Sequence, residues 1–139
     1  MLKRLLVAAD GSENSIRAAK EAARLGQLSE GAEVEIIYVM DFSKSKSEVL
    51  QSQNLETLEA ERRKRLIPVE EVFAKASIPH KLTMLNGDPG PAIVEYANKS
   101  SCDMVIVGSR GLNALQEMVL GSVSHKVAKR VKAPVLIVK

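Results

Sequence analysis

The chain has 139 residues, of which 45% are hydrophobic and 27% are charged, and its formal net charge is +3. That length suits one ordinary domain, which buries roughly two thirds of the surface that its unfolded chain exposes. No apolar run approaches the roughly 20 residues that a membrane span needs. The N-terminal segment reaches an acidic residue too soon for a signal peptide. We therefore expect one cytoplasmic domain over residues 1–139 that is not inserted in a membrane.

Cysteine, histidine and aromatic residues are too few for several other classes of site. The one cysteine, Cys102, has no partner for an internal disulfide, and His80 and His125 are too far apart in the sequence for a zinc motif. Aromatic residues make up only 3% of the chain and the positive charge is mild. General nucleic-acid binding, which relies on basic surfaces and stacking aromatics, is therefore not favoured.

Five short apolar runs are candidate strands. Several of them, such as "LLVAA", "MVIV" and "VLIV", are nearly continuous rather than alternating, which is typical of strands covered on both faces of a parallel sheet. The runs cover residues 2–9, 33–40, 80–85, 103–107 and 134–138.

Helical patterns separate the strands, and each carries a residue that commonly begins or interrupts a helix. They comprise residues 13–28 with Ser12 as a candidate cap, a region across 55–76 that Pro68 should kink or divide, a helix opened by Asp88 and Pro89, and a last helix from near Gly121 that ends before Pro134. The polar segment 42–54 has the composition of an excursion with weak order.

This alternation of strands and helices predicts an α/β fold. Helices between successive strands imply a parallel sheet with right-handed crossovers and helices on both faces. We expect a single-domain, doubly wound sheet of five parallel strands with helices on both faces. If the strand order is 3-2-1-4-5, the order switches direction between the first and the fourth strand.

Three residues lie at the predicted carboxyl ends of strands, where open parallel sheets bind their ligands. Asp10 follows the first strand, Val39 lies near the end of the second, and Gly108 follows the fourth. Asp10 has a second interpretation, as a turn or capping residue in "DGS", and the two roles are compatible.

The stretch "GSRGLNALQEMVLGSVS" contains two further elements of a possible anion site. Gly108 and Gly111 leave space near the backbone, and Arg110 between them is placed to reach a phosphate or a ribose. Farther on, the run Gly121, Ser122, Val123 and Ser124 enters the last helix, where unpaired backbone N–H groups and the helix dipole favour an anion.

Simpler interpretations compete with these. A lone glycine more often shapes a turn than binds a ligand, so the argument depends on the whole constellation, whose halves fall on a strand end and a helix start. Asp88 has a structural role as a cap. The basic run 61–65 is typical of a solvated helix face, and His125 of an exposed helical side chain.

Several motifs, in this order and spacing, resemble the universal stress protein family, and specifically its ATP-binding branch. They are "VAADGS", "IIYVM", "NGDP", "VIVGSRG", "LGSVS" and "APVLIVK", and the resemblance covers essentially the whole chain. It implies one universal stress protein domain, similar to the adenine nucleotide alpha hydrolase-like fold.

The resemblance also implies a set of binding residues and partners. Asp10 and the backbone at Val39 would hold adenine, and the glycine after the fourth strand would contact ribose or phosphate. The residues near the ribose and the phosphate chain would be Gly108, Arg110, Gly111, Gly121, Ser122, Val123 and Ser124. Magnesium or manganese is expected with the triphosphate, with no dedicated acidic ligand evident in the sequence. Homodimerisation is expected through the C-terminal strand, from Pro134 to Lys139.

The leading hypothesis is an ATP-binding regulatory protein of the stress response, with slow hydrolysis or autophosphorylation left open. Binding is favoured over turnover because the chain lacks the G-x4-G-K-[ST] loop of efficient phosphoryl-transfer proteins, and no catalytic residue can be named. The alternative is a dimeric adaptor that acts on protein partners without nucleotide. A phosphotransfer receiver fits less well, because it needs clustered carboxylates after the first strand and Asp10 stands alone there. A flavin carrier fits less well, because no hydroxyl-rich phosphate loop follows that strand.

Overall fold

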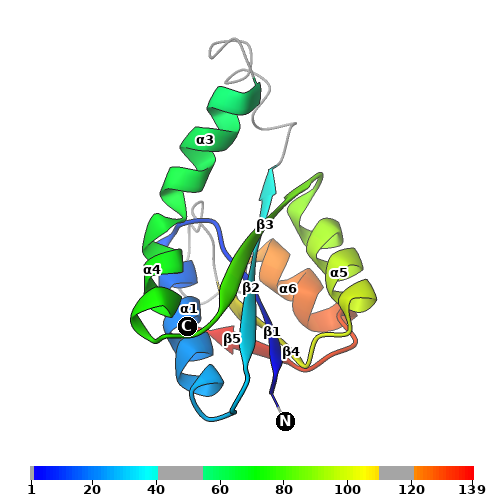
Figure 1. Cartoon of the computed structure of the whole chain (residues 1–139). Helices are drawn as coiled ribbons and strands as arrows, with labels where there is room; N and C mark the ends of the chain where they lie inside the picture. Colours follow the sequence, from blue (N-terminus) through cyan, green and yellow to red (C-terminus); the bar gives the residue numbers. More distant parts are fainter. Residues whose placement is uncertain (1, 41–54, 110–120) are drawn as a thin grey trace.

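The five strands form one parallel sheet in the order β3-β2-β1-β4-β5 (Figure 1). The computed structural model describes residues 2–40, 55–109 and 121–139, and the predicted excursion at 42–54 lies outside these ranges. The strands are β1 Arg4–Ala8, β2 Glu33–Met40, β3 His80–Asn86, β4 Met104–Gly108 and β5 Val135–Val138. The predicted fold class is confirmed, and so is the strand order 3-2-1-4-5.

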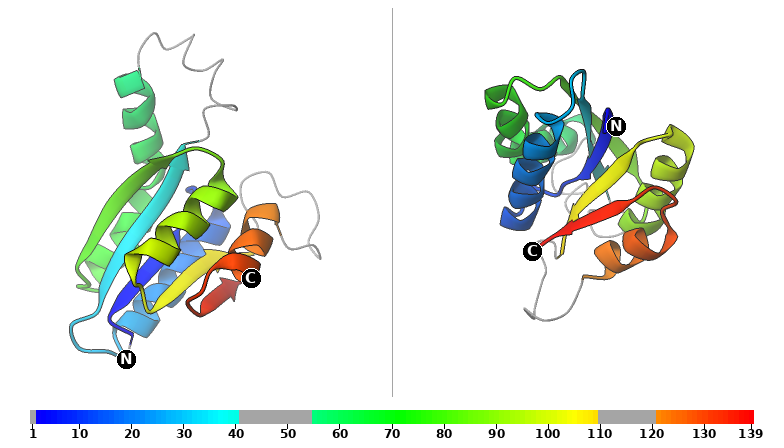
Figure 2. Two further views of the ribbon diagram at one scale, coloured as in Figure 1. Left: turned by 90° about the vertical axis from the view of Figure 1, so that its right-hand side faces the viewer. Right: turned by 90° about the horizontal axis from the view of Figure 1, so that it is seen from below.

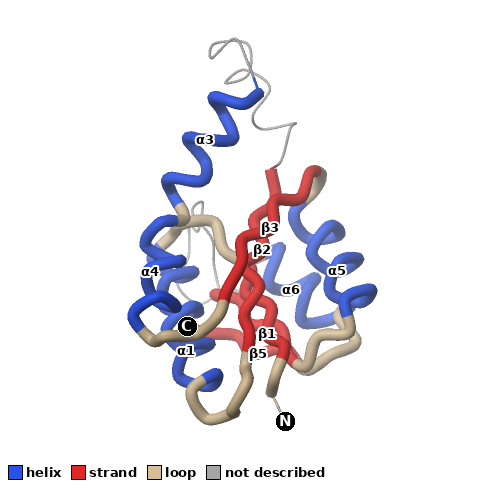
Figure 3. The backbone as a smooth tube through the Cα atoms, in the orientation of Figure 1, coloured by secondary structure: helices blue, strands red, loops and turns tan. Residues whose placement is uncertain are grey.

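Helices cover both faces of this sheet, as Figure 2 shows from two directions. Helices α1 and α4 pack on one face and α5 and α6 on the other, while α3 extends from α4 past the end of β2 (Figure 1). Their bounds are α1 Glu13–Gly26, α3 Leu55–Arg65, α4 Ile67–Lys75, α5 Pro89–Ser100 and α6 Ser122–Arg130. Figure 3 shows the same sandwich with the helices outside and the strands at the centre.

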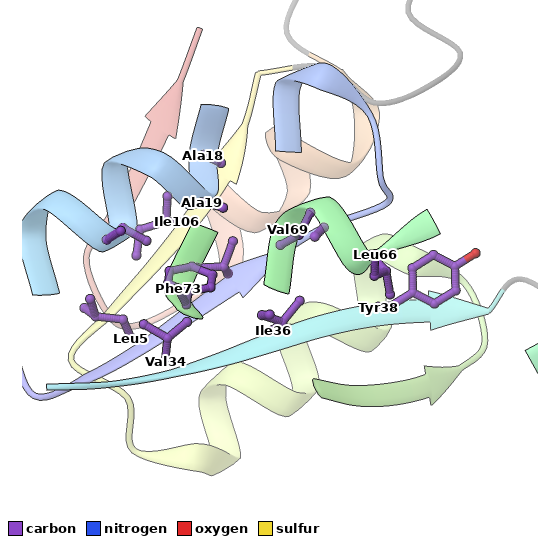
Figure 4. Close-up of a cluster of buried hydrophobic side chains, with 14 of the residues drawn as sticks. Leu5, Ala18, Ala19, Val34, Ile36, Tyr38, Leu66, Val69, Phe73 and Ile106 are labelled. Atoms are coloured by element: carbon purple, nitrogen blue, oxygen red, sulfur yellow. The ribbon is translucent and has the colours of Figure 1, made fainter. Parts of the chain in front are cut away.

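The core on the α1 and α4 side is built from large residues of the sheet and α4 and from small residues of α1 (Figure 4). Ile36 of β2 and Phe73 of α4 are fully buried there. Ala18 and Ala19 face them from α1. Because an alanine side chain is only a methyl group, the axis of α1 can lie close to the strands.

Two predicted helix boundaries are confirmed. Ser12 caps α1, with its hydroxyl oxygen accepting a hydrogen bond from the backbone N–H of Ser15 at 3.2 Å. The helical region 55–76 is divided at Leu66, and Pro68 lies in the first turn of α4, where a proline costs no intrahelical hydrogen bond.

The predicted capping role of Asp88 needs a correction. Asp88 occupies the position before α5, but its side chain makes no capping hydrogen bond. A capping side chain normally accepts from the second or third residue of the helix. Here the first and third are Pro89 and Pro91, which have no backbone N–H, so only one of the two usual donors remains.

Among the described helices, none is both long and apolar enough to cross a membrane.

Candidate functional site

The candidate site lies at the carboxyl ends of the central strands. Strand β1 pairs with β2 on one side and with β4 on the other, with Ala8 opposite Ile37 and Val107. The chain therefore leaves β1 and β4 toward opposite sides of the sheet, which is the switch point where such sheets bind ligands. Asp10, Val39 and Gly108 all lie at this edge, on three neighbouring strands or directly after them.

The turn after β1 is held by the side chain of Asp10. Its Oδ1 accepts a hydrogen bond from the backbone N–H of Ser12 at 2.9 Å, and the N–H of Gly11 donates to the hydroxyl of Ser15 at 3.1 Å. Gly11 has a φ of +86°, and a Cβ there would lie 2.8 Å from the carbonyl oxygen of Arg65. Asp10 is thus a turn residue, half-buried at the carboxyl edge of the sheet.

Gly108 ends β4 directly against the start of α1. A Cβ added to Gly108 would lie 3.0 Å from both the Cβ and the backbone oxygen of Asn14. The absence of a side chain therefore allows the first turn of α1 to pack on the end of β4. From the sequence, glycine was expected at position 108 because it leaves space for a ligand. The structure shows a second reason, which is the close packing of Asn14 against this position.

The end of β4 and the start of α6 are joined by two hydrogen bonds. The backbone N–H of Gly121 donates to the carbonyl of Ser109 at 2.8 Å. The hydroxyl of Ser124 donates to the carbonyl of Gly108. Residues 108–109 and 121–124 of the glycine motif thus lie side by side. The eleven residues between them lie outside the described ranges.

The N-terminus of α6 is arranged as an anion site would require. Gly121 precedes the helix with an extended backbone (φ −61°, ψ 153°) and has no side chain to cap it. The first N–H groups of a helix have no partner within the helix, and those of Ser122, Val123 and Ser124 donate to no group of the described residues. They can therefore bind an anion, and the helix dipole favours negative charge there.

The side chains in this turn differ in what they can offer. Ser122 is exposed, and Val123 packs against the core beneath α6. Ser124 is only 3% exposed and its single hydroxyl proton is directed at Gly108. Ser124 can therefore serve an anion through its backbone N–H but not through a hydroxyl donor. The neighbouring His125 is exposed.

Arg110 and Gly111, the other two predicted site residues, lie outside the described residues. Asn14 and Ser109 had not been singled out from the sequence, yet Asn14 packs against Gly108, and the carbonyl of Ser109 accepts a hydrogen bond from Gly121. Ser109 could have been found because it stands inside "GSRG". Asn14 gives no such signal, because its contact with Gly108 depends on how α1 packs.

The side chains of the described residues offer a metal ion no ready set of ligands. Within residues 2–40, 55–109 and 121–139, no group of three or more histidine, cysteine, aspartate or glutamate side chains is placed to hold a metal ion. A divalent ion at this edge would have to take its remaining ligands from a bound anion and from water, as magnesium commonly does.

Comparison with known proteins places the chain in one family. The model of the universal stress protein family matches residues 1–139. Universal stress protein MJ0531 of Methanocaldococcus jannaschii is 33% identical over 142 residues, which cover 100% of this chain and 83% of that protein. Among solved structures, the protein MJ0577 superposes with a TM-score of 0.86 at 30% identity, covering 100% of this chain and 96% of that one. A universal stress protein solved in complex with cAMP has a TM-score of 0.74 at 26% identity, covering 99% and 96%. The chain therefore belongs to the universal stress protein family.

Proposed function

We propose that this universal stress protein binds an adenine nucleotide, with ATP as the principal ligand, and acts as a regulatory module of the stress response. The observation that carries the proposal is the pair of hydrogen bonds joining Gly108 and Ser109 to the start of α6. They hold the unpaired N–H groups of α6 beside the switch point of the sheet. The family member solved with cAMP supports an adenine nucleotide as the ligand class.

The proposed nucleotide lies across the carboxyl edge of β2, β1 and β4. Asp10 and the backbone of Val39 would recognise adenine at one end. The ribose and phosphates would run toward Gly108 and the backbone N–H groups that follow Gly121. Arg110 and Gly111 complete the proposed set of phosphate contacts. Magnesium or manganese would accompany the triphosphate, coordinated by phosphate oxygens and water. We assign no catalytic residue, and the proposal is one of binding.

A second part of the proposal concerns assembly through β5. This strand is at one edge of the sheet and all four of its residues are half-exposed. The carbonyl of Pro134 accepts a hydrogen bond from the N–H of Val105 in β4, and the carbonyl of Val138 accepts one from the N–H of Ser109, directly after β4. Because backbone groups alternate sides along a strand, those of Val135 and Ile137 face the open edge. We propose that a second copy of the chain pairs there, since an open strand edge favours pairing.

A valine at position 121 tests the nucleotide site. Gly121 has a φ that any residue adopts, so Gly121→Val should fold, while its branched side chain should keep phosphate from the N–H groups of α6. The matched control is Asp88→Val, because Asp88 also precedes a helix with an extended backbone and makes no side-chain capping hydrogen bond.

Calorimetric titration with ATP and magnesium should show much weaker binding for Gly121→Val and parental binding for Asp88→Val. Parental affinity in the folded Gly121→Val variant would mean that the start of α6 does not bind phosphate. Equal losses in both variants would point instead to a general effect of disturbing a helix start.

A further inference from the structure

Glu35 is a charged residue buried in the sheet, far from the proposed nucleotide site. It lies on β2 and is only 6% exposed. Its Oε2 accepts hydrogen bonds from the hydroxyl of Thr83 on β3 and from the phenol of Tyr96 on α5. The ammonium of Lys81 lies 3.9 Å from the same oxygen. All three partners therefore act on one of the two carboxylate oxygens.

The other oxygen, Oε1, accepts a hydrogen bond from none of the described residues. Buried polar atoms are nearly always hydrogen-bonded, and a buried carboxylate oxygen without a donor is costly. A donor that comes from outside the chain, either solvent or a ligand, would remove that cost.

Glu35 lines a hollow that can contain such a donor. The hollow has a volume of about 190 Å³, against about 10–15 Å³ that one water molecule needs, so it is large enough for a small organic molecule. It lies at the amino ends of β1, β2 and β3, opposite to the edge that carries Asp10 and Gly108. It is therefore separate from the proposed nucleotide site.

The register of the strands gathers charges of both signs around Glu35. Arg4 pairs with Glu33, and Leu6 and Lys81 flank Glu35 on either side. Because alternate residues of a strand share a face, the side chains of all five belong to the same face of the sheet, and all five line the hollow. The hollow is therefore lined on this face by two cationic residues, two acidic residues and one apolar residue.

Arg4 is the group best suited to hold an anionic part of a ligand. Its side chain is exposed, and its guanidinium takes part in no hydrogen bond with the described residues. A guanidinium binds a carboxylate through two parallel hydrogen bonds. Glu35 is the buried charge of the hollow, whereas Arg4, Glu33 and Lys81 are exposed. A ligand with one charge of each sign can therefore place its cationic group on Glu35 and its anionic group on Arg4.

We propose that this hollow binds a small zwitterion of the α-amino acid class. The ammonium group of the ligand donates to Oε1 of Glu35, and its carboxylate accepts from Arg4, with Lys81 at the rim. The site does not depend on nucleotide binding, because it occupies the opposite end of the strands.

The test is a titration of the full chain with glycine and L-alanine, followed by the backbone amide signals in nuclear magnetic resonance spectra. Acetate and methylammonium, which each carry one end of the zwitterion, serve as comparison ligands. We expect the amides of Glu35, Thr83 and Arg4 to shift in a saturable way with the amino acids and less with acetate or methylammonium. Absence of saturable shifts with both amino acids would overturn the proposal, and so would equal shifts with the one-ended ions.

Two variants assign the binding groups. Glu35→Gln retains the size of the side chain but loses its charge, and Arg4→Met removes an exposed guanidinium with little risk to folding. Each should weaken amino-acid binding by about tenfold or more, as expected for losing a hydrogen bond to a charged group. Lys20→Met is the control, because Lys20 is exposed on α1, on the other side of the sheet. Parental binding by Arg4→Met would overturn the proposal even if Glu35→Gln failed to fold.

Discussion

The hydroxyl of Ser124 donates a hydrogen bond to the backbone carbonyl of Gly108, tying the first turn of α6 to the last residue of β4. This contact spans sixteen positions in the sequence. It fixes where the N-terminus of α6 lies relative to the switch point of the sheet. The position of the proposed phosphate site is thus set by a buried side chain that offers no hydroxyl proton to the phosphate.

Removing that hydroxyl should affect both stability and binding. Ser124→Ala leaves the Gly108 carbonyl without a buried donor, so we expect a loss of about 1 kcal/mol in the free energy of unfolding, measured by urea denaturation. Nucleotide affinity should fall as well, because the start of α6 is less firmly held. Ser122→Ala is the control, since Ser122 is exposed and its replacement should leave stability nearly unchanged. Equal stability of Ser124→Ala and Ser122→Ala would contradict the proposed anchoring role.

Two glycines should respond differently to alanine. At Gly108, the new Cβ would press on the Cβ and backbone of Asn14 at 3.0 Å, so we expect Gly108→Ala to lose about 1–3 kcal/mol through overpacking. At Gly90, the Cβ would meet the Cδ of Lys126 at 2.8 Å. That atom belongs to a flexible side chain that can move aside, so Gly90→Ala should be tolerated. Thermal or urea unfolding of both variants checks this order, and the reverse order would show that the end of β4 is less tightly packed than the structure indicates.

The phenol of Tyr96 should ionise late. The pKa of Tyr96 is raised above the ordinary value of tyrosine. The largest cause is its hydrogen bond to the Glu35 carboxylate, and burial and the negative charge of Glu35 act in the same direction. A raised folded-state pKa contributes stability that is complete below the unfolded pKa and is lost as the pH rises through the folded pKa. The chain has two tyrosines, so Tyr96→Phe identifies the relevant step in an ultraviolet absorbance titration.

The absorbance transition that disappears in Tyr96→Phe should lie above the ordinary tyrosine range. At neutral pH the variant should be less stable by about 1–2 kcal/mol, because a buried carboxylate loses a donor. This difference should shrink in strongly alkaline solution. A transition at or below the ordinary value would show that Tyr96 and Glu35 are not hydrogen-bonded in solution.

Pairing through β5 should depend on the outward backbone N–H of Ile137. Ile137→Pro removes that donor while the bonds to β4 made by its neighbours remain possible, and Ile137→Ala removes a similar amount of packing but keeps the N–H. Sedimentation analysis should show a dimer for the parent and for Ile137→Ala and a monomer for Ile137→Pro. A monomeric parent would contradict the proposed dimer directly.

The number of strands and their parallel arrangement were predictable because the signals for both are local. The runs "LLVAA", "MVIV" and "VLIV" are apolar on both faces, and helical patterns between them leave few arrangements for a parallel sheet. The division of α3 from α4 was predictable for the same reason, because a proline interrupts the helix within the turn that contains it, and Pro68 lies in the first turn of α4.

Other features depend on contacts between distant residues and were not predictable. Glu35 lies in the run "EVEIIYVM", which suggests a buried strand, but its partners Thr83 and Tyr96 are 48 and 61 positions away. The contact of Gly108 with Asn14 likewise depends on the packing of α1. In both cases the missing information is three-dimensional. The absent cap at Asp88 has a local cause instead, because Pro91, the third residue of α5, lacks one of the two N–H groups that a cap usually binds.

The most direct test of the nucleotide proposal is calorimetric titration of the purified, nucleotide-stripped protein with ATP and magnesium, together with mass analysis of whatever the untreated protein releases on denaturation. We predict saturable binding with a dissociation constant on the order of micromolar, equivalent to about −8 kcal/mol, or an adenine nucleotide that co-purifies with the protein. The absence of both would contradict the account, reduce "GSRGLNALQEMVLGSVS" to a structural turn and favour a dimeric adaptor that acts without nucleotide.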